Sequence, residues 1–178
     1  IGFCLVGSEM CIRDSPWGIM RFLEEAKNDL PKMITVQNSY SLLNRQYEVG
    51  NAEISMRENI GLLAYSPLAC GVLSGKYING TDQPNSRLNL FKRFVRYSSD
   101  QSTEATRRYL NLAQQFDISL TKMALAFVNQ QPFVTSNIIG ATTLSQLGEN
   151  IESINVELSS TLLAEIEKIH QEIPDPST

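Results

Sequence analysis

Three short segments of the chain carry side chains whose types and spacing suit the binding of a ligand. The first is TVQNS, residues 35–39, in which Gln37 and Asn38 follow a β-branched run. A carboxamide donates and accepts hydrogen bonds at once, so Gln37 suits a ligand that itself carries an amide. The same residues are also accounted for if the Gln37 carboxamide only caps a loop. This segment, taken alone, favours that simpler interpretation.

The second segment is YSPLACGVLSGKY, residues 65–77. Tyr65 closes an apolar run, and its ring could stack on a heteroaromatic ligand. Gly71 and Gly75 allow a ligand to approach the backbone, and Lys76 can pair with a phosphate. The glycine spacing is not that of a Walker loop. An ordinary turn with a solvated lysine accounts for the segment equally well.

The third segment is IIGATTLSQLGEN, residues 138–150, where an apolar run ends at Gly140 and a helical pattern follows. The free N–H groups of a helix start, together with the Thr142 hydroxyl, suit an anion. A helix cap by Thr142 or Thr143 with surface polar residues is the competing interpretation. The helical pattern carries three further polar side chains, Gln146, Glu149 and Asn150.

Alternating helical and strand-like patterns must position these segments. Apolar periodicity predicts helices at 16–30, 45–59, 102–116, 120–131, 143–154 and 159–173, and strands at 33–37, 60–68 and 133–141. The alternation predicts an α/β fold with about three parallel strands, whose carboxyl ends carry ligand groups. Three strands fit either a small three-layer sandwich or a piece of a larger α/β barrel. We expect residues 174–178 to be frayed.

Composition excludes several classes of function. The 178 residues carry a net charge of -4 without a basic stripe, which argues against nucleic acid as a partner. No apolar run approaches the roughly 20 residues of a membrane span. The three cysteines form neither a disulfide framework nor a metal site, so we expect a cytoplasmic protein without a metal. One basic segment, Arg87, Lys92, Arg93 and Arg96, is either solvated or faces a phosphate.

The first residues have a different character. LVGSEMCIRDS, residues 5–15, resembles the translation of a transposon-end adapter used in DNA library preparation. We therefore expect residues 1–15 to be foreign to the protein. Residues 16–178 would then be the carboxyl-terminal part of a single domain, which favours the barrel over the sandwich. A self-contained α/β protein that starts at Ile1 is the alternative.

The segments VQNSYSLLNR, LLAYSPLACGVLSGKY and ATTLSQLGENIESI, in this order, resemble the aldo-keto reductase family, and most of all its bacterial Tas-type members. They are also similar to the β subunits of voltage-gated potassium channels. The resemblance covers 16–178 and implies the carboxyl-terminal part of a (β/α)8 TIM barrel, an incomplete barrel. It further implies NADP(H) as cofactor and hydride transfer to a small carbonyl substrate.

The resemblance also assigns roles to residues. Gln37 would bind the nicotinamide carboxamide, Tyr65 would stack on its ring, and Arg87 would hold a phosphate. The pyrophosphate would be lined by Ser66, Pro67, Leu68, Cys70 and Lys76. The 2′-phosphate, ribose and adenine would meet Gly140, Thr142, Gln146, Glu149 and Asn150.

No catalytic residue is assigned, because the acid–base residues of the family lie upstream of anything in this chain. The resemblance therefore implies a fragment that is inactive alone, from a parent enzyme that reduces carbonyls. A nucleotide-binding regulatory module like the channel β subunits is the alternative. We expect unpaired strand edges to make the fragment fold poorly by itself. Neither the substrate nor the oligomeric state can be inferred from these residues.

Overall fold

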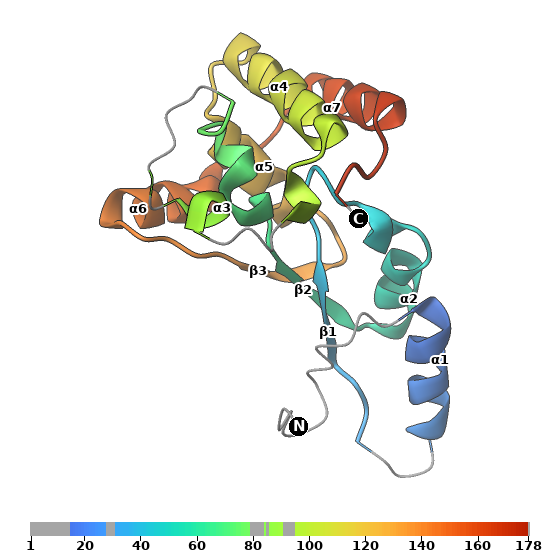
Figure 1. Ribbon diagram of the computed structural model, residues 1–178. Coiled ribbons are helices and arrows are strands. Elements are labelled where there is room, and N and C mark those ends of the chain that lie inside the picture. Colours follow the sequence, from blue (N-terminus) through green and yellow to red (C-terminus); the bar gives the residue numbers. More distant parts are fainter. Residues whose placement is uncertain (1–14, 28–30, 79–83, 85, 91–94, 178) are drawn as a thin grey trace.

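A parallel three-stranded sheet lies at the centre of the fold (Figure 1). The computed structural model describes residues 15–27, 31–78, 84, 86–90 and 95–177. The strands, in the spatial order β1-β2-β3, are β1 (Thr35–Ser39), β2 (Gly61–Tyr65) and β3 (Val134–Ile138). Both strand pairs are parallel, so the predicted α/β fold with three parallel strands is confirmed.

Helices follow and cover the strands (Figure 1). The α-helices are α1 (Pro16–Glu25), α2 (Asn51–Glu58), α3 (Arg87–Leu90), α4 (Asp100–Gln115), α5 (Leu120–Asn129), α6 (Leu144–Glu152) and α7 (Ser160–Glu172). The 3₁₀ helices are η1 (Gln46–Glu48), η2 (Ala69–Ser74), η3 (Val95–Tyr97) and η4 (Ser153–Asn155). Within the described ranges, no helix is long and apolar enough to cross a membrane.

Hydroxyl side chains fix where the longer helices begin. α1, α4, α5, α6 and α7 each follow a Ser or Thr whose oxygen accepts a hydrogen bond from the backbone N–H three residues on. Such a cap satisfies a donor that the helix itself leaves unpaired. The capping residues are Ser15, Ser99, Ser119, Thr143 and Ser159. Ser15 thus caps α1 although it falls in the stretch that we expected to be foreign.

The core lies between one face of the sheet and the helices that pack on it. Val36 pairs with Leu62 across β1 and β2, and both are buried together with Ala64. α5 packs on β3 and on η2, and its side chains from Met123 to Val128 are all buried. A helix that is apolar on every side belongs in the interior, which explains the central place of α5.

The opposite face of the sheet is much less covered. Gln37, Leu63 and Tyr65 are only half-buried, while Ser136 and Ile138 of β3 are exposed. Parallel sheets are normally covered on both faces. Among the residues that the structure describes, no strand pairs with the outer edge of β1 or of β3.

These uncovered edges carry a prediction about the chain by itself. We expect the 178-residue polypeptide, expressed alone, to aggregate, because unpaired strand edges recruit other chains. Size-exclusion chromatography and thermal melting would measure this. A monomeric product that melts cooperatively would contradict it.

The predicted helix at 45–59 is wrong in its first half. Gly50 has a φ of 94°, a left-handed conformation that interrupts a right-handed helix and that favours glycine. A Cβ built on Gly50 would also lie 3.1 Å from Cγ of Pro16. The segment therefore divides into η1 and α2.

The predicted fraying of 174–178 is wrong for the described part of this tail. Asp175 Oδ1 accepts a hydrogen bond of 2.6 Å from the backbone N–H of Arg45. The N–H of Ser177 donates to the Leu43 carbonyl at 3.1 Å, and the Ser177 and Ser102 hydroxyls lie 2.7 Å apart. These long-range bonds dock the tail against the segment that follows β1 and against α4, so Ser177 is buried.

Candidate functional site

The carboxyl ends of the three strands lie in one row. Ser39 pairs with Tyr65, and Tyr65 pairs in turn with Ile138. The segments that continue from these residues therefore start at the same edge of the sheet. The three segments singled out from the sequence therefore begin side by side.

Gln37 and Tyr65 project from the same face of the sheet. Gln37 pairs with Leu63, which stands two residues before Tyr65, and alternate residues of a strand share a face. The predicted strand end was wrong in one respect, because β1 runs on to Ser39 and Gln37 lies in its middle. Asn38 takes the opposite face, and its Oδ1 accepts a hydrogen bond of 2.8 Å from the Ser39 N–H. A carboxamide and an aromatic ring thus stand close together on the uncovered face.

The segment after β2 has an unusual backbone. Ser66, Ala69, Cys70, Gly71 and Gly75 all have positive φ values, between 49° and 91°. For a residue other than glycine such a conformation costs about 1 kcal/mol or more, and it gathers at sites where backbone approaches a ligand. Sequence reasoning found the two glycines but missed the other three residues, since their types do not signal a left-handed backbone.

Lys76 lies directly over this backbone. A Cβ built on Gly71 would be 3.2 Å from Nζ of Lys76, so a larger residue at 71 would displace the ammonium group. The same Nζ is 5.0 Å from the centre of the Tyr77 ring. The ammonium group is thereby placed beside the left-handed turn, as an anion partner would need to be.

Further cations gather at this turn. The Leu88 N–H donates to the Tyr77 hydroxyl at 3.2 Å, which ties α3 and its first residue Arg87 to the segment. Burial raises the pKa of the Cys70 thiol, while the positive charges of Arg87 and Arg96 act in the opposite direction. Both guanidinium groups therefore lie close enough to Cys70 to influence it.

The start of α6 is held by its own side chains. Thr143 caps the helix, so of the two caps considered Thr143 is the one observed. Gln146 Oε1 accepts hydrogen bonds from the N–H and the hydroxyl of Thr142, at 3.0 and 2.9 Å. A Cβ built on Gly140 would meet no atom within 4 Å, so the space above this turn is open. The turn presents exposed hydroxyl and backbone groups to solvent.

Asn150 holds this turn, and Glu149 joins α6 to the start of α5. Nδ2 of the buried Asn150 donates to the Gly140 carbonyl at 3.3 Å, and the Ser119 hydroxyl donates to Glu149 Oε1 at 2.6 Å. Both residues thus tie α6 to neighbouring elements, a structural role that would accompany any role in binding.

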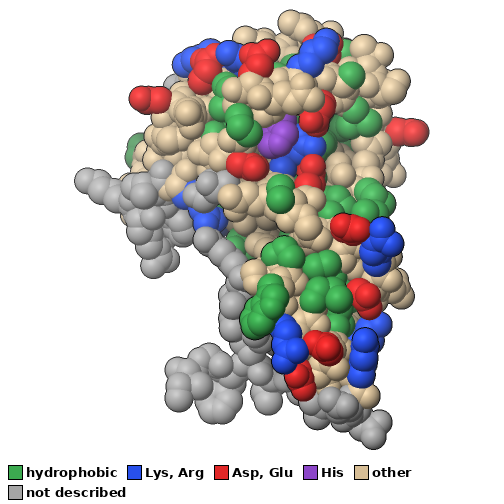
Figure 2. Space-filling view, turned by 90° about the vertical axis from the view of Figure 1, so that its right-hand side faces the viewer, with side chains coloured by type: hydrophobic (Ala, Val, Ile, Leu, Met, Phe, Trp, Pro, Cys, Tyr) green, Lys and Arg blue, Asp and Glu red, His purple; other side chains and the backbone are tan. Residues whose placement is uncertain are grey.

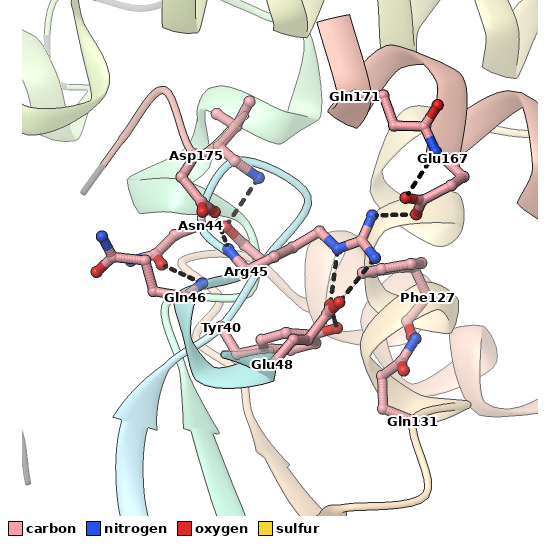
Figure 3. A network of polar contacts seen from close by, with 12 residues as sticks. Tyr40, Asn44, Arg45, Gln46, Glu48, Phe127, Gln131, Glu167, Gln171 and Asp175 are labelled. Atoms are coloured by element: carbon pink, nitrogen blue, oxygen red, sulfur yellow. Dashed lines mark hydrogen bonds and ion pairs between the residues drawn. The ribbon is translucent and has the colours of Figure 1, made fainter. Parts of the chain in front are cut away.

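An arginine with a largely buried side chain, Arg45, anchors the segment that follows β1 (Figure 3). The Arg45 guanidinium contacts Glu48 through two nitrogens, at 2.7 and 2.8 Å, and Glu167 of α7 at 2.8 Å. It also lies 5.3 Å from the centre of the Phe127 ring, and the Tyr40 hydroxyl donates to Glu48. Sequence reasoning missed this network, because Arg45 and Glu167 are 122 residues apart.

A cavity of about 490 Å³ lies elsewhere, beside α1. It is lined by apolar and charged side chains, among them Trp17, Arg21 and Lys32, and by none of the predicted cofactor residues. Figure 2 shows apolar side chains among acidic and basic ones on the face that carries α1 and α2. The sequence-derived site and this cavity are therefore separate.

Comparison with known proteins places the chain among relatives. Residues 12–171 match the model of a family described as Aldo/keto reductase family. Protein tas of Escherichia coli strain K12 is 51% identical over 159 residues, which cover 89% of this chain and 46% of that protein.

More distant relatives have different names. L-glyceraldehyde 3-phosphate reductase of the same strain is 35% identical over 167 residues, covering 90% of this chain and 47% of that protein. A probable voltage-gated potassium channel subunit beta of Oryza sativa subsp. japonica is 31% identical over 153 residues, covering 82% and 46%. The chain spans about half the length of these three relatives.

Proposed function

This chain belongs to the aldo/keto reductase family, and on that premise we propose that it is the carboxyl-terminal part of a longer NADPH-dependent enzyme that reduces small carbonyl compounds. The observation that carries the proposal is the meeting of a carboxamide, an aromatic ring and a cationic turn at one edge of the sheet. These are the groups that a nicotinamide, its ring face and a pyrophosphate require. The complete gene product is the polypeptide that carries this chain together with all that its gene encodes.

The cofactor is proposed to run along the carboxyl ends of the strands. Gln37 would accept hydrogen bonds from the nicotinamide carboxamide and donate hydrogen bonds to it. Tyr65 would stack on the nicotinamide ring. The left-handed turn after β2, with Lys76, would hold the pyrophosphate, and Arg87 of the adjoining α3 would pair with the 2′-phosphate. The open turn at the start of α6 would receive the 2′-phosphate, with Gly140 and Thr142 nearest. When bound, the cofactor would supply the hydride, and the residues of this chain would only hold and orient it.

The same site also suits a protein that binds the nucleotide without turnover. The relative from Oryza sativa, which is named as a probable channel subunit, supports this second candidate. Steady consumption of NADPH with an aldehyde by the complete gene product would favour the enzyme. Tight binding with no turnover would favour the regulatory module.

We expect Arg87→Ala in the complete gene product to weaken NADPH binding about tenfold, but NADH binding less than about threefold, because only NADPH carries the extra phosphate. Titration of each coenzyme, followed by the change in its fluorescence, would measure both dissociation constants. Arg107→Ala on the exposed side of α4 is the control and should change neither.

The two failures are distinguishable. Equal losses for NADPH and NADH would remove Arg87 from the 2′-phosphate while leaving a cofactor site. An unaltered complete gene product that binds neither coenzyme would reject the proposed function itself.

A further inference from the structure

A second cavity, of about 410 Å³, opens at the carboxyl end of β1. It lies between the end of that strand, η1, the start of α1 and α2, η3, and the carboxyl-terminal tail. Its lining is mostly polar and comprises Ser15, Pro16, Asn38, Ser39, Asn44, Gln46, Tyr47, Val49, Asn51, Arg96 and Asp175. None of the predicted cofactor residues is among them, so this cavity has not been assigned a role.

Among the described residues of this lining, Arg96 is the only cation. It is half-buried, and no carboxylate pairs with it in the part of the chain that the structure describes. A guanidinium group that is partly removed from water gains most from an anion that its planar array of N–H groups can grip. Arg96 is therefore placed as an anion-binding group in a polar cavity.

Two of the residues that offer acceptors in this lining, Asp175 and Asn44, are engaged by hydrogen bonds within the protein. Asp175 Oδ1 accepts from the Arg45 N–H at 2.6 Å. Asn44 donates through Nδ2 to the Ser39 hydroxyl and accepts from the Gln46 N–H through Oδ1. These bonds take up acceptor atoms that a cationic ligand would need, and Arg96 and Asp175 are the two charged residues of the described lining.

A further donor remains. Asn38 uses its Oδ1 to accept from the Ser39 N–H, and none of the described residues accepts from its Nδ2. Asn38 lines the cavity together with Arg96. A donor amide and a guanidinium group that line one cavity fit an oxyanion better than a neutral group.

The cavity adjoins the proposed cofactor site. Ser39 lies on the same face of β1 as Gln37 and two residues beyond it, at the edge of the sheet, whereas Asn38 takes the opposite face, so the lining includes residues from both faces of the strand end. η3, which carries Arg96, contacts the turn η2. A ligand in this cavity would thus lie near the proposed nicotinamide position, where the carbonyl substrate must bind.

Building on the proposed function, we propose that this cavity binds an anionic group of the carbonyl substrate, a carboxylate or a phosphate, with Arg96 and Asn38 as its donors. The enzyme would then prefer aldehydes that carry such a group over neutral aldehydes of the same shape. Arg96 would determine substrate specificity and would take no part in the hydride transfer.

The test compares two pairs of aldehydes in the complete gene product with NADPH. One pair is 4-carboxybenzaldehyde and benzaldehyde, and the other is glyceraldehyde 3-phosphate and glyceraldehyde. We expect Arg96→Met to raise KM for the anionic member of at least one pair about tenfold or more, and for the neutral members less than about twofold. The pair that responds identifies the anion as carboxylate or phosphate.

Two controls accompany this comparison. Arg107→Met on the exposed side of α4 should leave all four KM values unchanged. Arg96→Lys keeps the charge but loses the planar fork, so it should show a smaller rise for the anionic aldehydes. If Arg96→Met does not fold, Arg96→Lys takes its place in the comparison of KM values.

Each contrary result has a distinct meaning. Equal increases of KM for charged and neutral aldehydes would overturn the proposal, as would an unaltered enzyme without preference for the anionic member of either pair. A weaker affinity for NADPH with unchanged KM for all four aldehydes would assign Arg96 to the cofactor and overturn it too. Absence of NADPH binding in the unaltered protein would instead reject the proposed function, and this inference with it.

Discussion

Replacing Arg45 with Met in the complete gene product is expected to lower the free energy of unfolding by about 2–3 kcal/mol. The Arg45 side chain is only 10% exposed and joins Glu48 to Glu167, that is, the segment after β1 to α7. Met fills part of the space but leaves the Glu48 carboxylate, 29% exposed, without its cation. Loss of one partner of a partly buried ion pair costs more than the pair itself contributes.

Arg57→Met is the matched control for this prediction. Arg57 also pairs with a glutamate, Glu53, but its side chain is 75% exposed and the pair joins two residues of one helix. Such a pair contributes within about 0.5 kcal/mol. Urea unfolding of both variants would measure the difference, and similar small losses would show that the Arg45 network is not a structural anchor.

The Arg45 effect should also depend on pH. Burial raises the pKa of Glu167, but the hydrogen bond and charge of Arg45 more than offset this, so the pKa of Glu167 lies below its usual value. A lowered folded-state pKa contributes stability above the usual glutamate pKa and loses it as pH falls through the folded-state pKa. The stability difference between wild type and Arg45→Met should therefore shrink in acid and persist at neutral pH.

The sequence predicted the elements that depend on local patterns. Short apolar runs such as the one ending at Tyr65 predict strands, and Ser or Thr before an apolar period predicts where helices begin. The resemblance drawn from the three segments is confirmed, as is the fold class with three parallel strands and helices of a (β/α)8 barrel. The assignment of cofactor residues stays a prediction.

Features that depend on distant partners were not predictable. The tail at Asp175 reads as polar and proline-rich, yet it docks because Arg45, 130 residues earlier, offers its N–H. Cys70 has a left-handed backbone conformation, and cysteine is not a residue type that indicates one. Gly50 did indicate where the helical pattern stops, because a glycine within such a pattern can mark an interruption. The prediction of one continuous helix over 45–59 did not take this into account.

The second large effect concerns Gly61, where β2 meets β3. A Cβ built on Gly61 would lie 1.7 Å from Thr135 Oγ1 and 2.7 Å from Thr135 Cβ. Rotation of the Thr135 side chain would remove the first clash but not the second, because Cβ is fixed to the backbone. We expect Gly61→Ala to lower the free energy of unfolding of the complete gene product by about 3 kcal/mol, since the strands must separate.

Gly148→Ala provides the matched control, because a Cβ there meets no atom within 4 Å and the residue lies within α6. It should leave stability unchanged or raise it by up to about 1 kcal/mol. In a Thr135→Gly background, Gly61→Ala should cost far less, and this coupling identifies the clash as the cause.

Gly61→Ala should also affect the proposed cofactor site. Four residues after Gly61, β2 ends at Tyr65, and Tyr65 pairs across the sheet with Ile138. Ile138 lies two residues before Gly140. Moving β2 away from β3 would therefore separate the proposed nicotinamide end of the site from its proposed 2′-phosphate end. We expect Gly61→Ala to weaken NADPH binding even at temperatures where the variant stays folded, whereas Gly148→Ala should not. A Gly61→Ala protein that unfolds more easily but binds NADPH with unchanged affinity would show that the cofactor does not span these two strands.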